Sequence, residues 1–168
     1  MTNTTHFAPE ALEDLRKQIK GAVFAPGDSG YDGARMTWNL SVQQFPAVVV
    51  MATGAADIAA AVRFAARQGL KVGVQATGHG VIRPADGSLL INTAQMAGVQ
   101  VDPAARTARV EAGVQWGAVL EKAQAHGLAP LLGSSPGVGA VAYSLGGGLG
   151  WLARKYGIAA DSVRSSTS

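Results

Sequence analysis

Apolar runs of strand length alternate with a helical pattern in the first half of the chain. The run Ala47–Met51 has the uninterrupted apolar character of a buried strand. Residues 55–67 then place apolar side chains at helical spacing, with Thr53 as the expected N-cap and Gly69 beyond the end. Val72–Gln75 alternates again with a period of two. The pattern therefore predicts a β-α-β unit.

Elements of similar length are predicted on both sides of this unit. Pro9–Lys20 has the spacing of a short amphipathic helix, and Val114–His126 that of another. Ser88–Asn92 is a further short strand, while Gly98–Asp102 and Thr107–Glu111 are expected to pair as a hairpin. The predicted fold class is α+β, with small β-sheets flanked by helices.

Composition permits one hydrophobic core and disfavours several classes of protein. The chain has 168 residues, 48% of them hydrophobic, which suits a single domain. Its net charge of +3 includes only two adjacent basic pairs, Arg16-Lys17 and Arg154-Lys155, so no nucleic-acid partner is expected. No apolar run has the length of a membrane span and the polar start Met1–His6 is no signal peptide, so we expect a cytoplasmic protein without a membrane partner. The absence of cysteine excludes disulfides, thiolate metal ligands and a cysteinyl cofactor link.

The strand that ends at Gln75 runs into a loop of small residues, Ala76-Thr-Gly-His-Gly80. Residues Thr77 to Gly80 can adopt the tight or left-handed turns that direct successive N–H groups at an anion such as phosphate. His79 then lies within reach of whatever the anion carries. An ordinary turn with a solvated imidazole is the alternative interpretation.

A second segment, Gly133–Gly150, is dense in glycine. Glycine loses much conformational freedom on folding, and close approach of the backbone to a ligand is its usual use in such a segment. A flexible linker is the alternative, but Val138, Tyr143 and Leu145 stand between the glycines, and a linker has no use for them.

The same segment contains a dinucleotide-binding pattern. Gly137–Ala142 fits G-x-G-x-x-A, and Asp161 lies about twenty residues further on, where a Rossmann fold places its ribose acid. That fingerprint requires a strand directly before it, and Pro130 and Pro136 would each remove a donor from such a strand. A nicotinamide-binding Rossmann domain is kept as an alternative.

Several short motifs occur in an order that resembles a known family. They are Pro46–Met51, Gly78-His79, Val101–Pro103, Val110–Trp116, Gly137–Gly139, Leu145–Gly150 and Arg154–Gly157. Together they resemble the N-terminal FAD-binding (PCMH-type) domain of the vanillyl-alcohol oxidase superfamily, and in particular its berberine bridge enzyme-like and 6-hydroxy-nicotine oxidase-like members. The resemblance covers Leu12–Val163. It implies an N-terminal helix and lead-in over residues 1–30 and a PCMH-type domain over residues 31–168, incomplete at its C-terminus and without the substrate domain.

The resemblance implies FAD as the cofactor and two groups of binding residues. The first group wraps the pyrophosphate with backbone N–H groups and consists of Gln75, Ala76, Thr77, Gly78, His79 and Gly80. The second lines the ribityl chain and the ring and consists of Ser134, Ser135, Gly137, Val138, Gly139, Ala142, Tyr143 and Gly147. His79 matches the family position that bonds covalently to the 8α-methyl carbon of the flavin. A hydrogen bond alone, or no contact, is the alternative for this residue.

Three positions depart from the family pattern. Ser135 stands where members with two covalent links carry cysteine, so at most one covalent flavin bond is expected. Ala142 replaces a frequent glycine and leaves less room for the flavin. Gln75 replaces a frequent arginine, which weakens one phosphate or carbonyl contact.

The implied function is that of an FAD-dependent oxidoreductase, which oxidises a small alcohol, sugar or amine by hydride transfer to the flavin. The substrate would bind through the missing domain, and the groups that accept its proton come from there, so no catalytic residue is predicted in this chain. The chain is expected to be a truncated piece, inactive by itself. A non-catalytic flavin-binding remnant is the other alternative, beside the Rossmann domain.

Overall fold

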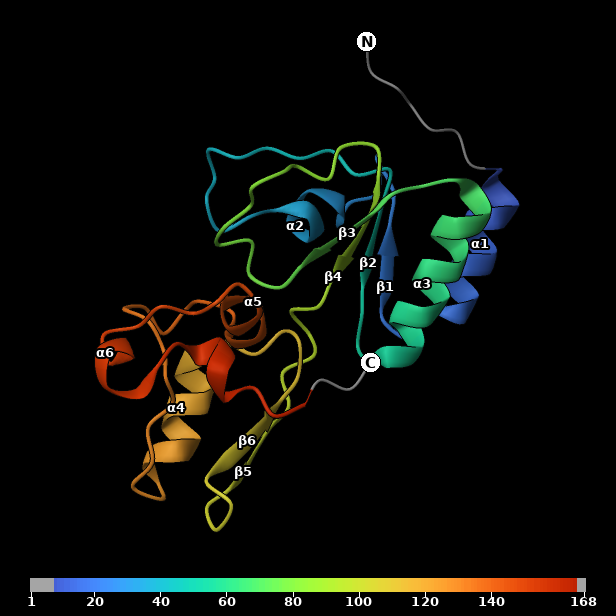
Figure 1. The fold of residues 1–168 in the computed structure, drawn as a ribbon. Coiled ribbons are helices and arrows are strands. Elements are labelled where there is room, and N and C mark those ends of the chain that lie inside the picture. Colours follow the sequence, from blue (N-terminus) through green and yellow to red (C-terminus); the bar gives the residue numbers. More distant parts are fainter. Residues whose placement is uncertain (1–7, 166–168) are drawn as a thin grey trace. The chain divides into compact units, whose positions relative to one another are not determined.

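The computed structural model describes residues 8–165, which divide into an N-terminal unit ending at Gln95 and a C-terminal unit starting at Met96 (Figure 1). Helices and small sheets make up both units, so the predicted α+β class is confirmed. The domain division predicted between residues 30 and 31 does not coincide with the boundary of these units and stays a prediction.

A four-stranded sheet forms the centre of the N-terminal unit. Its strands are β1 (Ala22–Phe24), β2 (Val48–Met51), β3 (Val72–Gln75) and β4 (Leu89–Asn92), in the order β1-β2-β4-β3. β4 runs parallel to both β2 and β3, and β1 pairs antiparallel with β2. The predicted β-α-β unit is present, but β4 separates its two strands. β3 consequently lies at the edge of the sheet.

A short helix, α2 (Tyr31–Arg35), packs on one face of this sheet. Tyr31 and Ala34 form a buried cluster with Val49 of β2 and Leu90 of β4. The Tyr31 hydroxyl donates a 2.6 Å hydrogen bond to the Pro46 carbonyl, just before β2. Burial raises the pKa of this phenol above its ordinary value.

Two longer helices, α1 (Pro9–Gln18) and α3 (Ala55–Gln68), lie together on the opposite side of the sheet (Figure 1). Their apolar residues face the core, with Leu15 and Phe64 almost completely buried. α3 ends at Gly69, whose φ of 66° is the left-handed conformation that commonly stops a helix, as predicted.

The start of α3 differs from the prediction. Its N-cap is Gly54 and not Thr53, because the Thr53 side chain donates to the Asp57 carboxylate (2.8 Å). That carboxylate also accepts the backbone N–H groups of Thr53 (2.9 Å), Lys20 (2.8 Å) and Gly21 (3.2 Å). Burial acts to raise the pKa of Asp57, but these hydrogen bonds lower it below its ordinary value. Asp57 thus ties α3 to the chain that leads into β1.

The C-terminal unit begins with the predicted hairpin of β5 (Val99–Asp102) and β6 (Thr107–Val110). Helix α4 (Trp116–Gln124) packs against β5, and its Lys122 ammonium donates to the Val99 carbonyl at 2.8 Å. Three short helices follow: α5 (Ala140–Leu145), α6 (Ala153–Tyr156) and the 3-10 helix η1 (Ala159–Ser162). The buried core of this unit consists of Val99, Val114, Trp116, Val119 and Ala140.

Some element ends differ from the sequence prediction for local reasons. The first helix stops at Gln18 because Ile19 is buried with an extended backbone. The predicted helix 114–126 begins only at Trp116, since Gln115 forms an isolated antiparallel bridge with Gly139.

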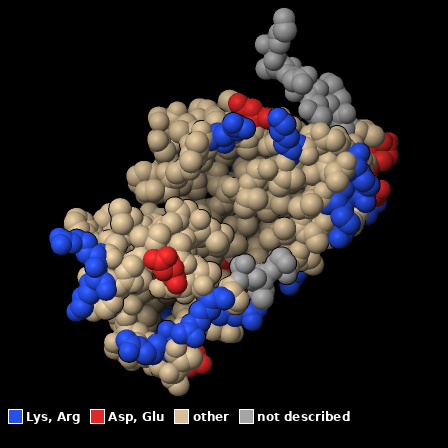
Figure 2. All heavy atoms as spheres, in the orientation of Figure 1, with Lys and Arg blue, Asp and Glu red and all other residues tan. Residues whose placement is uncertain are grey.

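Figure 2 shows the Lys and Arg side chains of the drawn face in several small groups, some of them beside Asp or Glu. Within residues 8–165, no helix combines the length and apolar character that a membrane crossing requires.

Candidate functional site

The loop after β3 offers a row of unpaired backbone N–H groups. Within the described part of the chain, the amides of Ala76, Thr77, Gly78 and Gly80 donate no hydrogen bond. The His79 amide donates to the Thr77 hydroxyl at 3.3 Å. Successive free N–H groups just after the end of a strand form a concave set of hydrogen-bond donors, and such sets bind phosphate oxygens. Four amides of the predicted loop are therefore not used by the described part of the chain, and their role in binding an anion stays a prediction.

Gly78 is required in this loop by its backbone and by its neighbour. Its φ is +69°, a conformation that residues with a side chain rarely adopt. A Cβ atom at this position would also lie 2.8 Å from the Thr37 Cα and 3.1 Å from the Gln75 Cδ. The loop thus packs directly against residue 37 of the segment between α2 and β2.

Gln75 is buried, and its side-chain amide is fully used within the protein. Its Nε2 donates to the Met36 carbonyl (2.8 Å), and its Oε1 accepts from the Gln44 Nε2 (2.7 Å). Gln44 in turn donates to the Arg35 carbonyl and accepts from the Ala85 amide. These amides fasten the segment 36–44 to the end of β3, and this role could not be predicted without the fold.

His79 lies half-buried against an aromatic neighbour that the sequence did not identify. The imidazole and the Trp38 indole have ring centroids 4.2 Å apart and planes tilted by 32°. The Nδ1 atom of His79 is buried without a hydrogen-bond partner. A buried polar atom left unpaired costs about 1–3 kcal/mol, so the chain as it stands leaves one hydrogen bond of His79 unmade.

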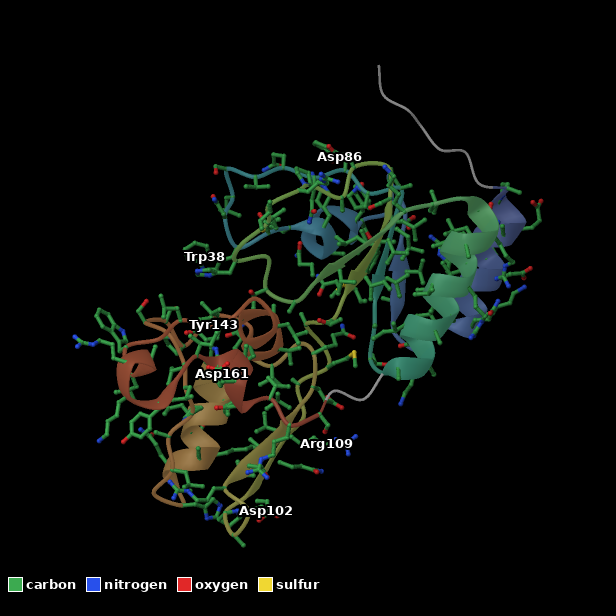
Figure 3. The ribbon with its side chains drawn as sticks, in the orientation of Figure 1. Trp38, Asp86, Asp102, Arg109, Tyr143 and Asp161 are labelled. Atoms are coloured by element: carbon green, nitrogen blue, oxygen red, sulfur yellow. The ribbon has the colours of Figure 1, made fainter. Side chains whose placement is uncertain are left out.

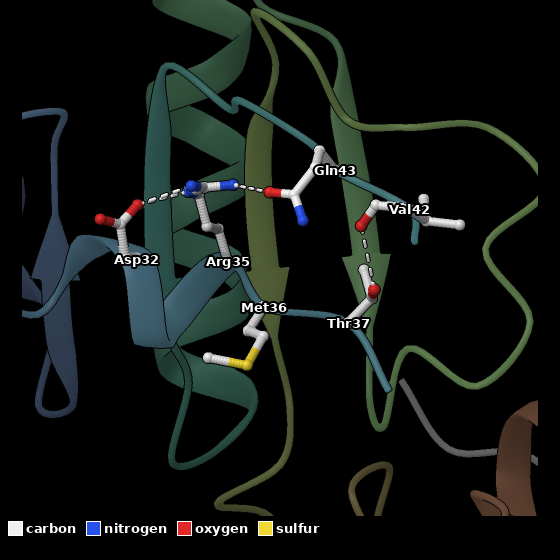
Figure 4. Close-up of a pocket in the computed structure, with 6 residues that line it drawn as sticks. All are labelled: Asp32, Arg35, Met36, Thr37, Val42 and Gln43. Atoms are coloured by element: carbon white, nitrogen blue, oxygen red, sulfur yellow. Dashed lines mark hydrogen bonds and ion pairs between the residues drawn. The ribbon is translucent and has the colours of Figure 1, made fainter. Parts of the chain in front are cut away.

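A small cavity of about 160 Å³ lies beside this segment (Figure 4). Arg35 crosses it, paired with Asp32 (2.7 Å) and with the Gln43 Oε1 (3.3 Å), and its guanidinium lies 4.5 Å from the centre of the Phe45 ring. The remaining lining residues are Met36, Thr37 and Val42. None of the predicted cofactor residues lines it, and the Arg35 guanidinium is already paired, so this cavity is no candidate for the cofactor site.

In the C-terminal unit, the glycine-rich segment runs beside the start of α4. The Trp116 amide donates to the Val138 carbonyl (3.0 Å), and the Gly117 amide donates to the Pro136 carbonyl (2.9 Å). No strand leads directly into Gly137, because the element before it is helix α4, and the helix that follows has only six residues. The Rossmann alternative is therefore wrong, because the fingerprint requires a strand that leads directly into a helix.

The remaining predicted residues of this segment differ in exposure. The side chains of Ser134 and Ala142 are exposed, and Gly147 has a φ of +106° with open space where a Cβ atom would stand. The Ser135 hydroxyl accepts the Gly137 amide at 3.3 Å. This turn leaves the Ser134 hydroxyl without a partner among the described residues.

Tyr143 accounts for part of the glycine density. A Cβ atom on Gly133, Gly148 or Gly150 would lie within 3.3 Å of its ring or hydroxyl. The ring also contacts Trp116 edge to face, with centroids 5.7 Å apart. The Tyr143 hydroxyl and the Trp116 indole nitrogen are both buried without partners. These glycines therefore make room for an aromatic side chain, and the two polar atoms beside it lack hydrogen-bond partners.

Comparison with known proteins assigns the chain to a family. Residues 46–167 match the model of the FAD binding domain. The chain belongs to this family. The donor row at residues 76–80 and the orphaned His79 nitrogen fit such a cofactor, because a pyrophosphate needs N–H donors and no residue of the loop opposes its charge.

Relatives of this FAD binding domain include oxidases and other FAD-linked oxidoreductases. It is 34% identical to (R)-6-hydroxynicotine oxidase of Paenarthrobacter nicotinovorans over 89% of the chain and 33% of that enzyme. It is 29% identical to chitooligosaccharide oxidase of Gibberella zeae over 94% of the chain and 33% of that enzyme.

Solved structures give the same result. The fold matches 6-hydroxy-D-nicotine oxidase from Arthrobacter nicotinovorans with a TM-score of 0.80 at 34% identity, covering 85% of this chain and 32% of that one. It matches the BBE-like 1 protein of Physcomitrella patens with a TM-score of 0.81 at 29% identity, covering 89% and 34%. The chain thus spans about a third of the length of these relatives, and the predicted resemblance to 6-hydroxynicotine oxidase-like and berberine bridge enzyme-like proteins is confirmed.

Proposed function

We propose that this chain is the FAD-binding part of an FAD-dependent oxidoreductase that oxidises a small alcohol, sugar or amine. The observation that carries the proposal is the row of free amides beside His79, whose Nδ1 is buried without a partner. The family match and the oxidases among the relatives support it. FAD supplies the acceptor for a hydride from the substrate.

The loop after β3 holds the pyrophosphate in this proposal. The free N–H groups of Ala76, Thr77, Gly78 and Gly80 serve as its donors. Backbone donors bind phosphate charge without a lysine or arginine, and the carbonyl of Gln75 at the root of the loop is fixed by the Thr93 amide at 2.8 Å. The proposed donors are therefore backbone groups of a loop that is anchored to the sheet.

Residues of the C-terminal unit supply the second group of contacts in the proposal. Ser134 and Ser135 carry hydroxyl groups, and the half-buried Gly137 and Gly147 have backbone that a ligand could approach closely, whereas Gly139 is buried. The other members of this group are Val138, Ala142 and Tyr143.

His79 is proposed to carry the flavin covalently, as an 8α-histidyl link. A nitrogen of the imidazole would form the bond to the 8α carbon and give up its proton, and the methyl group would give up one proton as well. Dioxygen would take up the two protons and the two released electrons as hydrogen peroxide, with FAD supplying the path for the electrons. Because Ser135 has no thiol, no second link forms.

The test is acid precipitation of the complete protein that contains this chain. We expect the yellow colour to remain with the precipitate, and a tryptic peptide containing His79 to carry the flavin mass. His79→Ala should still bind FAD through the intact backbone loop but release it in acid. His126→Ala, an exposed histidine at the end of α4, is the matched control and should keep its flavin.

Two results would contradict the proposal. Free FAD in the acid supernatant of the unmutated protein, after loading and turnover, would remove the covalent role of His79. A flavin that no alcohol, sugar or amine bleaches under anaerobic conditions would favour a non-catalytic flavin-binding protein.

A further inference from the structure

Two segments of the N-terminal unit run side by side for three successive contacts. The Met36 carbonyl accepts from the Gln75 side chain at 2.8 Å. One residue further on, Thr37 lies against Gly78 so closely that no Cβ atom fits between them. At the end of the series, the ring of Trp38 lies over His79. These contacts place the two backbone segments that carry the indole and the imidazole next to each other.

The segment that carries Trp38 is braced independently of any ligand. The Thr37 hydroxyl lies within hydrogen-bond distance of two carbonyls of its own loop, those of Asn39 (2.6 Å) and Val42 (3.2 Å). The Gln44 amide ties the far end of the loop to Arg35 and to β3 through Gln75. Trp38 thus stands on a loop that is held in place at both ends.

Burial does not explain the presence of a tryptophan here. Trp38 is 64% exposed, so its large apolar surface gains little from the core. The aromatic contact recorded for its indole is the one with His79. Figure 3 shows Trp38 on this loop, which follows helix α2 in the chain.

We propose that Trp38 is a positioning residue, which restricts the orientation of the His79 imidazole and so speeds its bonding to FAD. The inference rests on the proposed covalent role of His79. An imidazole free to rotate about its side-chain bonds presents its nitrogen in the reactive direction only part of the time, and an aromatic ring packed against the imidazole narrows that range. Trp38 takes no proton or electron in the step.

The experiment compares attachment with binding in the complete protein. Apoprotein is mixed with FAD, and covalent flavin is measured over time as fluorescence that survives denaturing electrophoresis. Trp38→Leu should slow attachment between about twofold and tenfold, the range expected for an aromatic contact of ordinary strength. Trp38→Phe, which restores an aromatic face, should stay within about twofold of the unmutated rate.

Two controls separate positioning from folding and from cofactor affinity. Leu40→Ala removes a side chain of the same loop that is equally exposed (65%), and it should leave the attachment rate unchanged. In a His79→Ala background, Trp38→Leu should leave the dissociation constant for FAD within about twofold, because the backbone cradle is intact.

Three outcomes would overturn the inference. Trp38→Leu attaching flavin at the unmutated rate would show that the stack does not matter, and a matching loss of FAD affinity in the His79→Ala background would make Trp38 a binding residue. An unmutated protein without covalent flavin would reject the covalent role of His79 and this inference together. Should Trp38→Leu not fold, Trp38→Met is the non-aromatic variant to compare with Trp38→Phe.

Discussion

Thr37 and Gly78 lie so close that a Cβ atom on Gly78 would stand 2.8 Å from the Thr37 Cα. Two segments that are far apart in the sequence thus touch through their backbones at the residue before His79. Side-chain adjustment cannot relieve this contact, because the atom that Cβ would meet belongs to the main chain. The glycine in the predicted Gly-His pair is therefore a packing requirement as well as a turn residue.

The first prediction concerns that contact. Gly78→Ala should lower the free energy of unfolding of the FAD-free protein by about 1–3 kcal/mol, because it combines positive-φ strain with a backbone clash. Urea denaturation measures the change. Gly80→Ala is the matched control, since a Cβ atom there meets nothing within 4 Å and its φ is not positive. Equal stability of the two variants would contradict the assignment.

The second prediction concerns the buried carboxylate of Asp57. Its four hydrogen bonds lower its pKa in the folded state, so the stability it contributes is present above about pH 5 and is lost as the pH falls toward the lowered folded value. Asp57→Asn should cost at least about 2 kcal/mol at neutral pH and should flatten the acid limb of the stability profile.

Thermal melts at a series of pH values test this. The control is Asp14→Asn, because Asp14 makes an exposed ion pair with Lys17 (3.1 Å) that should contribute less than about 1 kcal/mol. An unchanged acid limb in Asp57→Asn would show that the carboxylate does not govern it.

The third prediction separates two glycines of the second segment. Gly148→Ala should cost about 2 kcal/mol or more, because its φ is +69° and a Cβ atom would lie 2.5 Å from the Ala159 Cβ and 2.8 Å from the Tyr143 ring. Gly137→Ala should cost less than about 1 kcal/mol, since nothing but the Ser135 hydroxyl oxygen, at 3.8 Å, lies near. Thermal unfolding without FAD distinguishes them. If Gly137→Ala were the more damaging change, the packing account of Tyr143 would be mistaken.

The fourth prediction compares two tyrosines: the buried hydroxyl of Tyr143 has no hydrogen-bond partner, whereas the hydroxyl of Tyr31 has one. Tyr143→Phe removes a hydroxyl without a partner, so the FAD-free protein should be as stable or more stable, while FAD affinity falls if the bound cofactor uses that oxygen. Tyr31→Phe removes the 2.6 Å bond to Pro46 and should lose about 1 kcal/mol. Calorimetry of both variants, with and without FAD, provides the readout. A loss of stability in FAD-free Tyr143→Phe would mean that its hydroxyl is satisfied within the protein.

The sequence predicted those parts of the fold that depend on local patterns. Runs and alternation of apolar residues predict the strands β2, β3 and β4, and a glycine predicts the end of α3 at Gly69. Both signals depend on only a few neighbouring residues. β1 (three residues) and α2 (five residues) were missed, because segments so short carry too few positions to show a period.

The candidate site could be predicted only in part for the same reason. His79 and the glycines around it are visible as a motif, whereas the Trp38 neighbour exists only through tertiary packing. Tyr143 gives the opposite case: glycines that suggest ligand contact instead accommodate its ring. A pattern of residue types cannot tell an internal neighbour from an external one.

The strand order makes the loop that carries His79 depend on a strand that lies later in the chain. β3 is hydrogen-bonded to β4 alone within the described sheet, and β4 in turn pairs with β2. β3 therefore joins the rest of the sheet only through β4. A change that weakens β4 should loosen the His79 loop as well, although no residue of β4 belongs to the candidate site.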